Sequence, residues 1–330
     1  MNVSLSSALR ALLLVACSVA SASAADEKAK PAAKPKPKPT ATAAPAGPKP
    51  TEVNVPYGKH PKQVIDFYQA ESKEPTPVVF YIHGGGWRGG SKNNYNPIAF
   101  LREGISVVAV EYRFVDEAAA DAVEPPVKGP LHDAARALQF VRSKAKEWNL
   151  DKTRIAATGG SAGACSSLWL AFHDDLADPK SEDSIAREST RLLAAAVIGA
   201  QTSLDPKQMK EWMPNSKYGS HAFLPLDGNG RAQPFEAFLE KREQLLPLIK
   251  EYSPYELVTS DDPAIGLYYG PPPAMGKETP DPTHSANFGL GLQEKCKSVG
   301  VECELIYKGA ADVKHETPAD FLISKLKAKK

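Results

Sequence analysis

The sequence predicts an α/β fold with a mainly parallel sheet that is covered by helices on both faces. Runs made almost wholly of apolar residues recur along the chain, such as PVVFYI at 77–82 and SVVAVEY at 106–112. A continuous apolar run indicates a strand that is buried on both faces. Segments with apolar residues at helical spacing separate several of these runs. Strands that alternate with helices in this way are typical of a parallel sheet.

The expected elements follow one another from residue 51 onward. Strands are predicted at 51–56, 63–69, 77–82, 106–112, 154–158, 192–200, 264–269 and 302–307. Helices are predicted at 130–148, after residue 161, at 285–297 and at 318–327. Residues 202–260 interrupt the alternation, because they are polar and rich in Pro, Trp and Tyr, with an amphipathic piece at 235–250. We expect an insertion at about 202–260 that forms a cap over the sheet.

Composition and charge suit a globular domain at residues 51–330. The chain has 330 residues, of which 42% are hydrophobic and 24% are charged. Its net charge of +1 is unevenly distributed. Residues 1–50 hold Arg10 and six lysines against Asp26 and Glu27, a net +5, so the remainder carries about −4. A mildly acidic body gives no reason to propose nucleic acid as a partner.

The first 50 residues predict export followed by a spacer. Arg10, a ten-residue apolar run at 11–20 and Ala-Ser-Ala at 22–24 fit a signal peptide over residues 1–25. An alternative is a bacterial lipoprotein box at 14–17, in which Cys17 would be lipidated and would tether the protein to a membrane. Residues 26–50 are mostly Lys, Pro and Ala and predict a disordered linker. We therefore expect a periplasmic or secreted protein.

No metal site is expected among the other cysteines. Cys165 lies four residues after Ser161 and is expected to be buried packing. Cys296 and Cys303 flank a turn from a helix to a strand and would pair in an oxidising compartment only if their geometry allows it. No cluster of residues has the spacing of metal ligands, so no metal is expected.

Residues 154–170 combine a short β-like run, a glycine-rich turn and an apolar, helix-forming run. Gly159-Gly160-Ser161-Ala162-Gly163 matches G-x-S-x-G, the pattern of a nucleophile elbow. Such a tight turn strains the backbone of the serine, and Gly159 and Gly163 lack the Cβ atoms that would clash there. The following helix points its first N–H groups toward negative charge near the serine. Ser161 is therefore the predicted nucleophile.

A second glycine-rich motif, His83-Gly84-Gly85-Gly86-Trp87, follows the buried strand at 77–82. Successive glycines let backbone N–H groups turn inward without side chains in the way. A serine nucleophile needs a base, an acid that orients the base, and N–H groups that stabilise the oxyanion of the tetrahedral intermediate. We expect the N–H groups of Gly85, Gly86 and Ala162 to form this oxyanion site.

HGGGW followed by GGSAG resembles the motifs of α/β-hydrolase esterases and lipases of the hormone-sensitive-lipase-like branch and its secreted bacterial carboxylesterase relatives. The resemblance covers about residues 55–330 and includes EYR at 111–113. It implies an α/β-hydrolase fold and an exported serine carboxylic-ester hydrolase that forms an acyl-enzyme on Ser161. It also implies a triad in the chain order Ser, then Asp or Glu, then His, and no metal or organic cofactor.

The resemblance indicates a base after the last strand, where His315 opens the last helix. The other histidines have less suitable positions. His60 lies early, His83 is in the glycine turn, His132 and His284 begin helices, His173 is on the elbow helix and His221 is in the insertion. His315 is therefore the predicted base.

The acid is expected directly after the strand at 264–269, but the loop there departs from the family pattern. It runs from Gly270 to Pro282, contains three consecutive prolines and has no Asp at its start. Glu278 is the preferred acid because it lies nearest the expected place before the next helix. Asp281 is the second candidate and Asp312, close to His315 in sequence, is the third; Asp261 and Asp262 precede the strand. We expect the loop to fold back so that Glu278 or Asp281 reaches His315.

Two functions are consistent with these features. The first is an exported esterase that acts on a small-molecule ester or on an acetylated or feruloylated polysaccharide, a substrate class suggested by export alone. The second is a binding protein that keeps the hydrolase fold with an incomplete triad. Aromatic residues that either line an acyl or aryl pocket or simply pack the cap are Trp87, Trp212, Tyr218 and Phe223.

Overall fold

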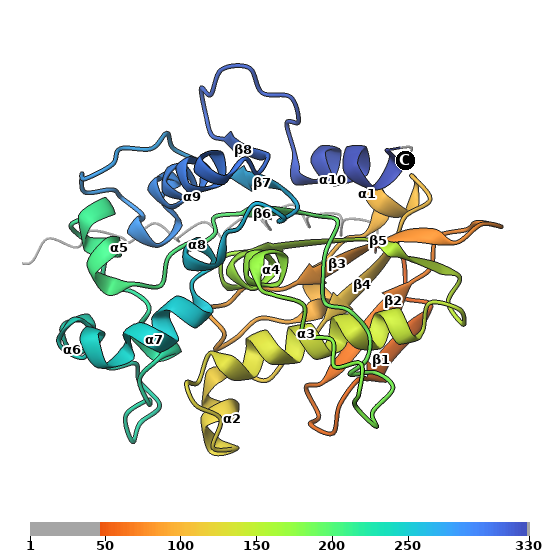
Figure 1. The fold of residues 1–330 in the computed structure, drawn as a ribbon, viewed down its shortest axis with the longest axis horizontal. Coiled ribbons are helices and arrows are strands. Elements are labelled where there is room, and N and C mark those ends of the chain that lie inside the picture. Colours follow the sequence, from red (N-terminus) through yellow and green to blue (C-terminus); the bar gives the residue numbers. More distant parts are fainter. Residues whose placement is uncertain (1–46, 329–330) are drawn as a thin grey trace, which may run out of the picture. The chain divides into compact units, whose positions relative to one another are not determined.

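The computed structural model describes residues 47–328. The predicted signal peptide, Cys17 and nearly all of the predicted linker lie outside these residues. An eight-stranded sheet runs through the described part (Figure 1). Its strands are β1 (Glu52–Pro56), β2 (Val64–Tyr68), β3 (Thr76–Ile82), β4 (Ser106–Val110), β5 (Leu150–Gly160), β6 (Ala194–Ile198), β7 (Ala264–Tyr268) and β8 (Cys303–Ile306).

The sheet is mainly parallel, in the order β1-β2-β4-β3-β5-β6-β7-β8. β2 pairs antiparallel with both β1 and β4, and every pairing from β4 through β3 to β8 is parallel. In a parallel sheet the carboxyl ends of the strands meet at one edge. Ile82, Gly160, Ile198 and Tyr268, which close β3, β5, β6 and β7, are thus brought to the same edge. The loops that leave these four strands carry the candidate site.

Helices cover both faces of the sheet (Figure 1). They are α1 (Ile98–Leu101), α2 (Val115–Ala120), α3 (Lys128–Ser143), α4 (Ala162–Phe172), α5 (Pro206–Trp212), α6 (Phe235–Glu240), α7 (Arg242–Tyr252), α8 (Pro254–Leu257), α9 (Ala286–Val299) and α10 (Pro318–Lys327). Three 3₁₀ turns are η1 (Lys92–Asn94), η2 (Ser220–Ala222) and η3 (Pro282–His284).

The alternation of side chains along β3 shows why its sequence is apolar throughout. Val78, Phe80 and Ile82 belong to a core shared with α3, α4 and α9, and Val79 belongs to a second core shared with α10. Successive residues of a strand point to opposite faces, so a strand covered on both sides has no solvent-facing position. The prediction of an α/β fold with a mainly parallel sheet is confirmed.

The segment between β6 and β7 is helical and irregular. It contains α5, η2, α6, α7 and α8, and the predicted amphipathic piece at 235–250 is divided into α6 and α7 at Lys241. Its backbone is joined to the rest of the domain by the N–H of Val127, which donates to the carbonyl of Ala222 at 3.0 Å. Phe223 stacks on Phe238 within the segment at 5.5 Å between ring centroids.

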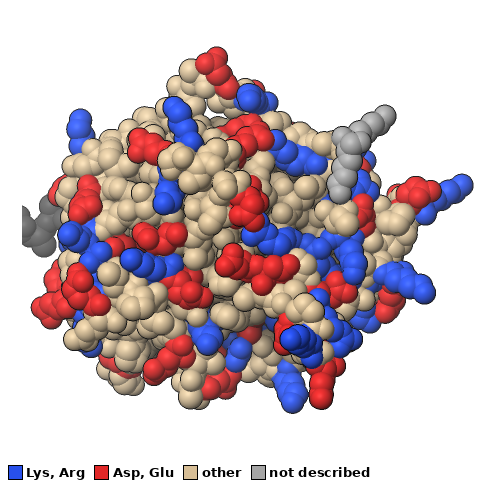
Figure 2. Space-filling view, in the orientation of Figure 1, with Lys and Arg blue, Asp and Glu red and all other residues tan. Residues whose placement is uncertain are grey.

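The surface of the described part has mixed charge. Figure 2 shows basic and acidic side chains interspersed over the face in view. Among residues 47–328, no helix combines the length and the apolar character needed to cross a membrane.

Candidate active site

Ser161 lies at a sharp turn between β5 and α4. Its backbone has φ 53° and ψ −120°, a strained region for a residue with a side chain. A Cβ on Gly163 would lie 2.1 Å from the carbonyl oxygen of Ile82, and one on Gly159 would lie 2.5 Å from the same oxygen. Only glycine allows β3 and the start of α4 to approach so closely. The turn therefore has the geometry expected of a nucleophile elbow.

A hydrogen-bonded chain of three side chains converges at this turn. The Nε2 atom of His284 lies 3.0 Å from the Oγ atom of Ser161, and the Nδ1 atom of His284 lies 2.8 Å from Oδ2 of Asp281. A carboxylate at Nδ1 fixes the tautomer in which Nε2 can accept the serine proton. The three residues are thus arranged as a nucleophile, a base and an acid, in the chain order that the resemblance implies.

The position of His284 is set by the turn that Asp281 caps. Oδ1 of Asp281 accepts the N–H groups of Thr283 and His284 at 3.2 and 3.3 Å, while Oδ2 holds the ring of His284. The side-chain amide of Gln201 donates to the carbonyl of Thr283 at 2.5 Å. Gly199, with φ 60°, leaves room for the imidazole, because a Cβ there would lie 3.3 Å from its Cδ2.

The carboxyl group of Asp281 is charged at neutral pH. Partial burial acts to raise the pKa of Asp281, but the hydrogen bond and the charge of His284 and two backbone N–H groups outweigh it, so the pKa is lowered from its usual value. A carboxylate in this state can stabilise the imidazolium that forms when His284 takes a proton.

The prediction that His315 is the base is wrong in this structure. His315 does follow β8, but its Nδ1 is held by the carboxylate of Glu304, with the nearer oxygen at 3.0 Å, and its ring packs edge-on against Phe321. The hydroxyl of Tyr268 donates to the carbonyl of His315 at 3.1 Å. The imidazole that reaches Ser161 comes instead from the loop after β7.

The prediction that Glu278 is the acid is also wrong. Glu278 is exposed and forms no hydrogen bond or ion pair within residues 47–328, and Asp312 is exposed in a turn with φ 53°. Asp281, the second candidate, holds a histidine, although the histidine is His284 rather than His315. An aspartate is sufficient here because acid and base lie three residues apart on one turn.

The proline-rich loop folds back because two asparagines hold it. The N–H of Ala274 donates to Oδ1 of Asn287 at 2.6 Å, and Nδ2 of Asn287 donates to the carbonyl of Ala274 at 3.0 Å. Asn215 pairs in the same two-way manner with the backbone of Thr279, at 3.2 and 2.8 Å. The loop is therefore held by α9 on one side and by the segment between β6 and β7 on the other.

The glycine turn that carries the predicted oxyanion residues Gly85 and Gly86 begins beside the serine. A Cβ on Gly84 would lie 2.5 Å from the carbonyl oxygen of Gly160 and 3.5 Å from Cβ of Ser161. Gly85 and Gly86 have φ 109° and 63°, which turn the backbone sharply after β3. Among the hydrogen bonds of residues 47–328, none uses the N–H of Gly85, Gly86 or Ala162 as donor. Within the described part of the chain, these N–H groups therefore have no acceptor.

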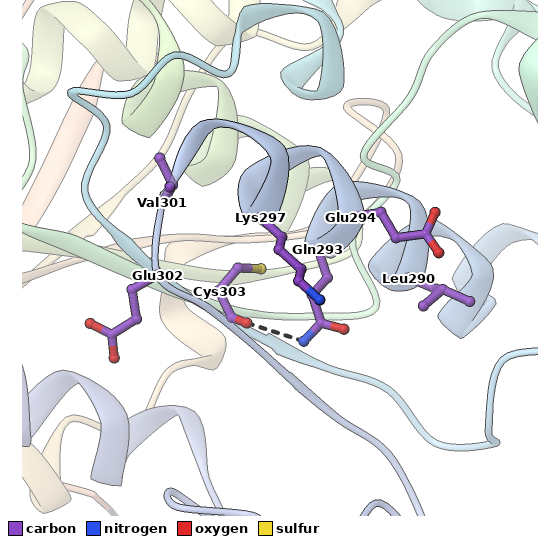
Figure 3. A pocket seen from close by; sticks show the side chains of 8 residues that line it. Leu290, Gln293, Glu294, Lys297, Val301, Glu302 and Cys303 are labelled. Carbon is purple, nitrogen blue, oxygen red and sulfur yellow. Dashed lines mark hydrogen bonds between the residues drawn. The ribbon is translucent and has the colours of Figure 1, made fainter.

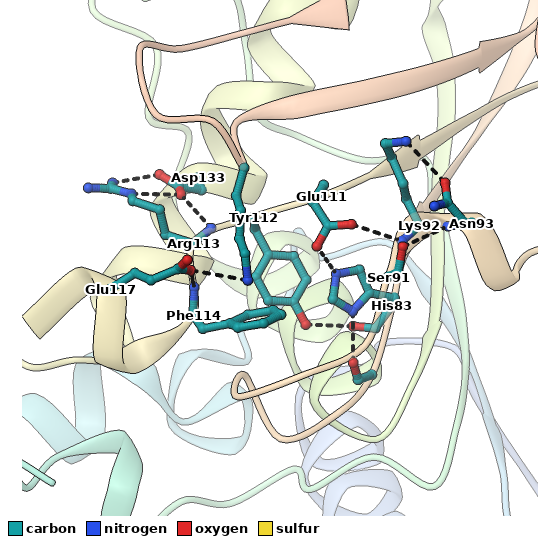
Figure 4. Close-up of polar contacts among 12 residues, drawn as sticks. His83, Ser91, Lys92, Asn93, Glu111, Tyr112, Arg113, Phe114, Glu117 and Asp133 are labelled. Atoms are coloured by element: carbon teal, nitrogen blue, oxygen red, sulfur yellow. Dashed lines mark hydrogen bonds and ion pairs between the residues drawn. The ribbon is translucent and has the colours of Figure 1, made fainter. Parts of the chain in front are cut away.

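The first residue of the glycine motif is fixed by the EYR segment at 111–113 (Figure 4). Nε2 of His83 lies 3.1 Å from Oε1 of Glu111, and its Nδ1 lies 2.8 Å from the carbonyl of Gly84. The hydroxyl of Tyr112 donates to the carbonyl of His83 at 2.8 Å. Burial acts to raise the pKa of Glu111, but hydrogen bonding to His83 and the other partners lowers it overall. His83 therefore anchors the glycine turn rather than acting on a substrate.

Two adjoining cavities flank His284. One of about 410 Å³ contains Ser161 and is walled by Tyr81, Ile198, Tyr268 and Tyr269. The other, of about 420 Å³, is lined mainly by apolar groups of the proline-rich loop, with Glu278 among its lining residues. Both include His284 and Gly270. Volumes of this size are typical of small-molecule sites.

A larger hollow of about 660 Å³ lies between α9 and β8 (Figure 3). It is lined by Gln293, Lys297 and Cys303 among others, and the Gln293 amide donates to the carbonyl of Cys303 at 3.1 Å. None of the residues of the Ser161–His284–Asp281 chain lines it. Cys296 and Cys303 are free thiols in the structure.

The sequence contains a local signal for His284 as the base. Asp281-Pro282-Thr283-His284 places an aspartate before a proline at the first position of a turn, a pattern that favours a capped helical turn. Residues three apart on such a turn are neighbours. An acid and a base could thus have been read from one short segment.

Comparison with known proteins identifies the family of this chain. A model of the BD-FAE family matches residues 65–272. The Mycobacterium tuberculosis carboxylesterase NlhH is 35% identical over 102 residues, which are 30% of this chain and 30% of that protein. Gut esterase 1 of Caenorhabditis elegans is 30% identical over 149 residues, 42% of this chain and 25% of that protein. The matches thus span less than a third of these relatives' own lengths.

A solved structure shares the fold at low identity. The acetyl ester-xyloside bifunctional hydrolase from Caldicellulosiruptor lactoaceticus superposes with a TM-score of 0.56 and 21% identity, over 80% of this chain and 87% of that one. The prediction of a hormone-sensitive-lipase-like α/β-hydrolase esterase family is confirmed. The chain belongs to the BD-FAE family and has the α/β-hydrolase fold of esterases.

Proposed function

We propose that this protein is a serine carboxylic-ester hydrolase. The observation that carries the proposal is the hydrogen-bonded chain from Asp281 through His284 to Ser161, at a strained elbow beside unpaired backbone N–H groups. Each part has a distinct role in acyl transfer, and together they satisfy the geometric requirements of the reaction.

In the first half of the reaction, Oγ of Ser161 attacks the ester carbonyl carbon while Nε2 of His284 takes the hydroxyl proton. The carbonyl oxygen becomes an oxyanion, which the N–H groups of Gly85, Gly86 and Ala162 stabilise. The tetrahedral intermediate collapses, the bond to the alcohol oxygen breaks, and His284 gives its proton to the leaving alkoxide. The acyl group is then bound to Ser161.

In the second half, water attacks the acyl carbon and gives a proton to His284. A second oxyanion forms in the same place and collapses, returning the proton to Ser161 and releasing the carboxylic acid. Asp281 remains ionised throughout and stabilises the imidazolium in both halves.

The two cavities beside His284 suggest how an ester lies in the site. The leaving alcohol must lie near Nε2 of His284, and the apolar cavity of the proline-rich loop adjoins that histidine. We therefore place a bulky alcohol group of the substrate in this cavity. Polysaccharide-linked acetyl esters are one such class, and the described activity of the fold neighbour from Caldicellulosiruptor motivates testing them. A small-molecule ester is the alternative substrate.

The test is a panel of esters that varies the acyl and alcohol groups separately, with wild type and Ser161→Ala. Loss of the nucleophile should lower kcat by a factor on the order of 10⁶ and abolish labelling by a fluorophosphonate probe. Ser298→Ala, which alters an exposed serine on α9 whose hydroxyl bonds only to the carbonyl of Lys295, is the matched control and should retain both. Unchanged hydrolysis by purified Ser161→Ala would reject the proposal. Wild type that binds esters without turnover or labelling would favour a non-catalytic binding protein instead.

Export completes the proposal. The signal-like residues 1–25 support a periplasmic or secreted location, and Cys17 supports lipid attachment as the alternative.

A further inference from the structure

Tyr218 differs from the other three aromatic residues considered for the substrate pocket. Trp87 is buried and its Nε1 donates to Oγ of Ser166 at 3.0 Å. Phe223 stacks on Phe238, and Trp212 packs edge-on against Tyr255 and Phe288. Tyr218 instead lies on the segment between β6 and β7 with its hydroxyl at the glycine turn.

The hydroxyl of Tyr218 occupies the space that a side chain at position 86 would need. A Cβ built on Gly86 would lie 2.2 Å from this hydroxyl oxygen and 4.0 Å from Nε2 of His221. Gly86 carries one of the backbone N–H groups assigned to the oxyanion. A polar group from outside the sheet therefore lies directly against the oxyanion turn.

The ring of Tyr218 is held in this place by its neighbours. It packs edge-on against His221, with 4.8 Å between the ring centroids. The ring of His221 is in turn tilted against that of Trp87, with 6.2 Å between their centroids. The next residue, Gly219, has φ 117° and lies between Met209 and Phe238. Few side-chain rotations are available to a ring packed in this way, so its hydroxyl is positioned before a substrate arrives.

The hydroxyl also has a free proton to donate. Within residues 47–328 it makes no hydrogen bond, and Tyr218 is half-buried. Burial raises the pKa of Tyr218, so the phenol stays protonated at neutral pH. The adjacent His221 is buried with Nε2 unpartnered in the described part of the chain, and burial, followed by the charge of Arg88, lowers its pKa to about 4. Neutral His221 therefore places no positive charge beside the phenol.

We propose that the Tyr218 hydroxyl donates an additional hydrogen bond to the oxyanion of the tetrahedral intermediate, alongside the N–H groups of Gly85, Gly86 and Ala162. This inference rests on the proposed function. A donor that is unpaired in the free enzyme and paired in the transition state accelerates the chemical step without tightening substrate binding. The segment between β6 and β7 would then contribute to catalysis as well as covering the sheet.

The experiment compares Tyr218→Phe with Tyr252→Phe. Tyr252 is a buried tyrosine of α7 that packs on Trp169, and its hydroxyl makes no hydrogen bond within residues 47–328. Tyr218→Phe should lower kcat by about 10- to 100-fold, below the 10²–10³ measured for a main oxyanion donor, with KM within about twofold of wild type. Tyr252→Phe should leave both constants unchanged. Both variants should melt within about 2 °C of wild type, because neither removes a hydrogen bond of the free protein.

A second measurement separates donation from a structural role. Sulfur accepts hydrogen bonds weakly, so wild type should hydrolyse an ester faster than the matching thionoester. Tyr218→Phe should reduce this preference by the same factor by which it lowers kcat on the ester. An unchanged kcat, an unchanged preference, or a loss of kcat explained by a fall in Tm would each overturn the inference. If wild type hydrolyses no ester at all, the proposed function itself fails; if wild type is active and Tyr218→Phe equals it, only this inference fails.

Discussion

Two histidines of this protein each have a carboxylate at Nδ1, and the partner of Nε2 distinguishes them. His284 has Asp281 at Nδ1 at 2.8 Å, and His315 has Glu304 at Nδ1 at 3.0 Å. A carboxylate at Nδ1 prepares either ring to act as a base. Only Nε2 of His284 faces a nucleophile, Oγ of Ser161 at 3.0 Å. A carboxylate–histidine pair is therefore not sufficient evidence of a base without the position of its second nitrogen.

Substitution of these two histidines should therefore have very different effects on kcat. His284→Ala should reduce kcat nearly as far as loss of Ser161, whereas His315→Ala should keep kcat within about threefold, because triad members act as a unit. Asp281→Asn should cost about 10⁴ in kcat by favouring the wrong tautomer, and Glu278→Gln should cost little. Steady-state kinetics on one activated ester measures all four variants. A larger loss from His315→Ala than from His284→Ala would contradict the pairing of His284 with Ser161.

At the scale of elements, the site depends on how closely the strand and helix of the elbow approach. Gly163 is the second residue of α4 and lies against the backbone at the end of β3. A Cβ there would be 2.1 Å from the carbonyl oxygen of Ile82. Position 160 is also glycine, yet a Cβ there would meet nothing closer than the carbonyl oxygen of Ile198 at 3.9 Å. Close packing against β3 therefore requires glycine at position 163, whereas position 160 has room for a side chain.

Thermal unfolding of Gly163→Ala and Gly160→Ala should show this difference. The extra methyl at 163 forces a backbone shift and should destabilise the fold by about 1–3 kcal/mol, with a matching fall in Tm. The methyl at 160 has ordinary van der Waals room, so Gly160→Ala should keep Tm within about 2 °C of wild type. Equal melting temperatures for the two variants would show that the elbow tolerates a side chain at 163.

At the scale of the whole molecule, two hydrophobic clusters form the core of residues 47–328. Both hydrophobic clusters lie between Tyr57 and Leu326. The predicted signal peptide lies outside the described residues.

Expression of the full chain in a bacterium tests the proposed export. We expect the protein in the periplasm or medium, with a mass that corresponds to cleavage between Ala24 and Ala25, because Ala-Ser-Ala at 22–24 fits the signal peptidase pattern. Intact-mass measurement of the purified protein gives the answer. A lipidated chain that begins at Cys17 would support the lipoprotein alternative, and an unprocessed chain in the cytoplasm would contradict export.

The fold class could be predicted because its causes are local. Apolar runs such as 77–82 and 106–112 encode strands buried on both faces, and the structure has β3 and β4 there. The elbow at Ser161 was predictable for the same reason: a strand, two crowded glycines and a helix are contiguous in sequence. In these places, backbone sterics and side-chain periodicity leave few alternatives.

The pairing of Asp281 with His284 is local in sequence, but only tertiary structure decided that this pair serves Ser161 and that Tyr218 lies at the oxyanion turn. Asp281 and His284 reach Ser161 because the loop before them is held by Asn215 and Asn287, from two other parts of the chain. Tyr218 meets Gly86 across 132 positions of sequence. Such contacts depend on how separate elements pack, and the spacing of residues along the chain does not encode that packing. The sequence alone therefore determined the class of fold and the nucleophile, and the packing of distant segments selected the partners of that nucleophile.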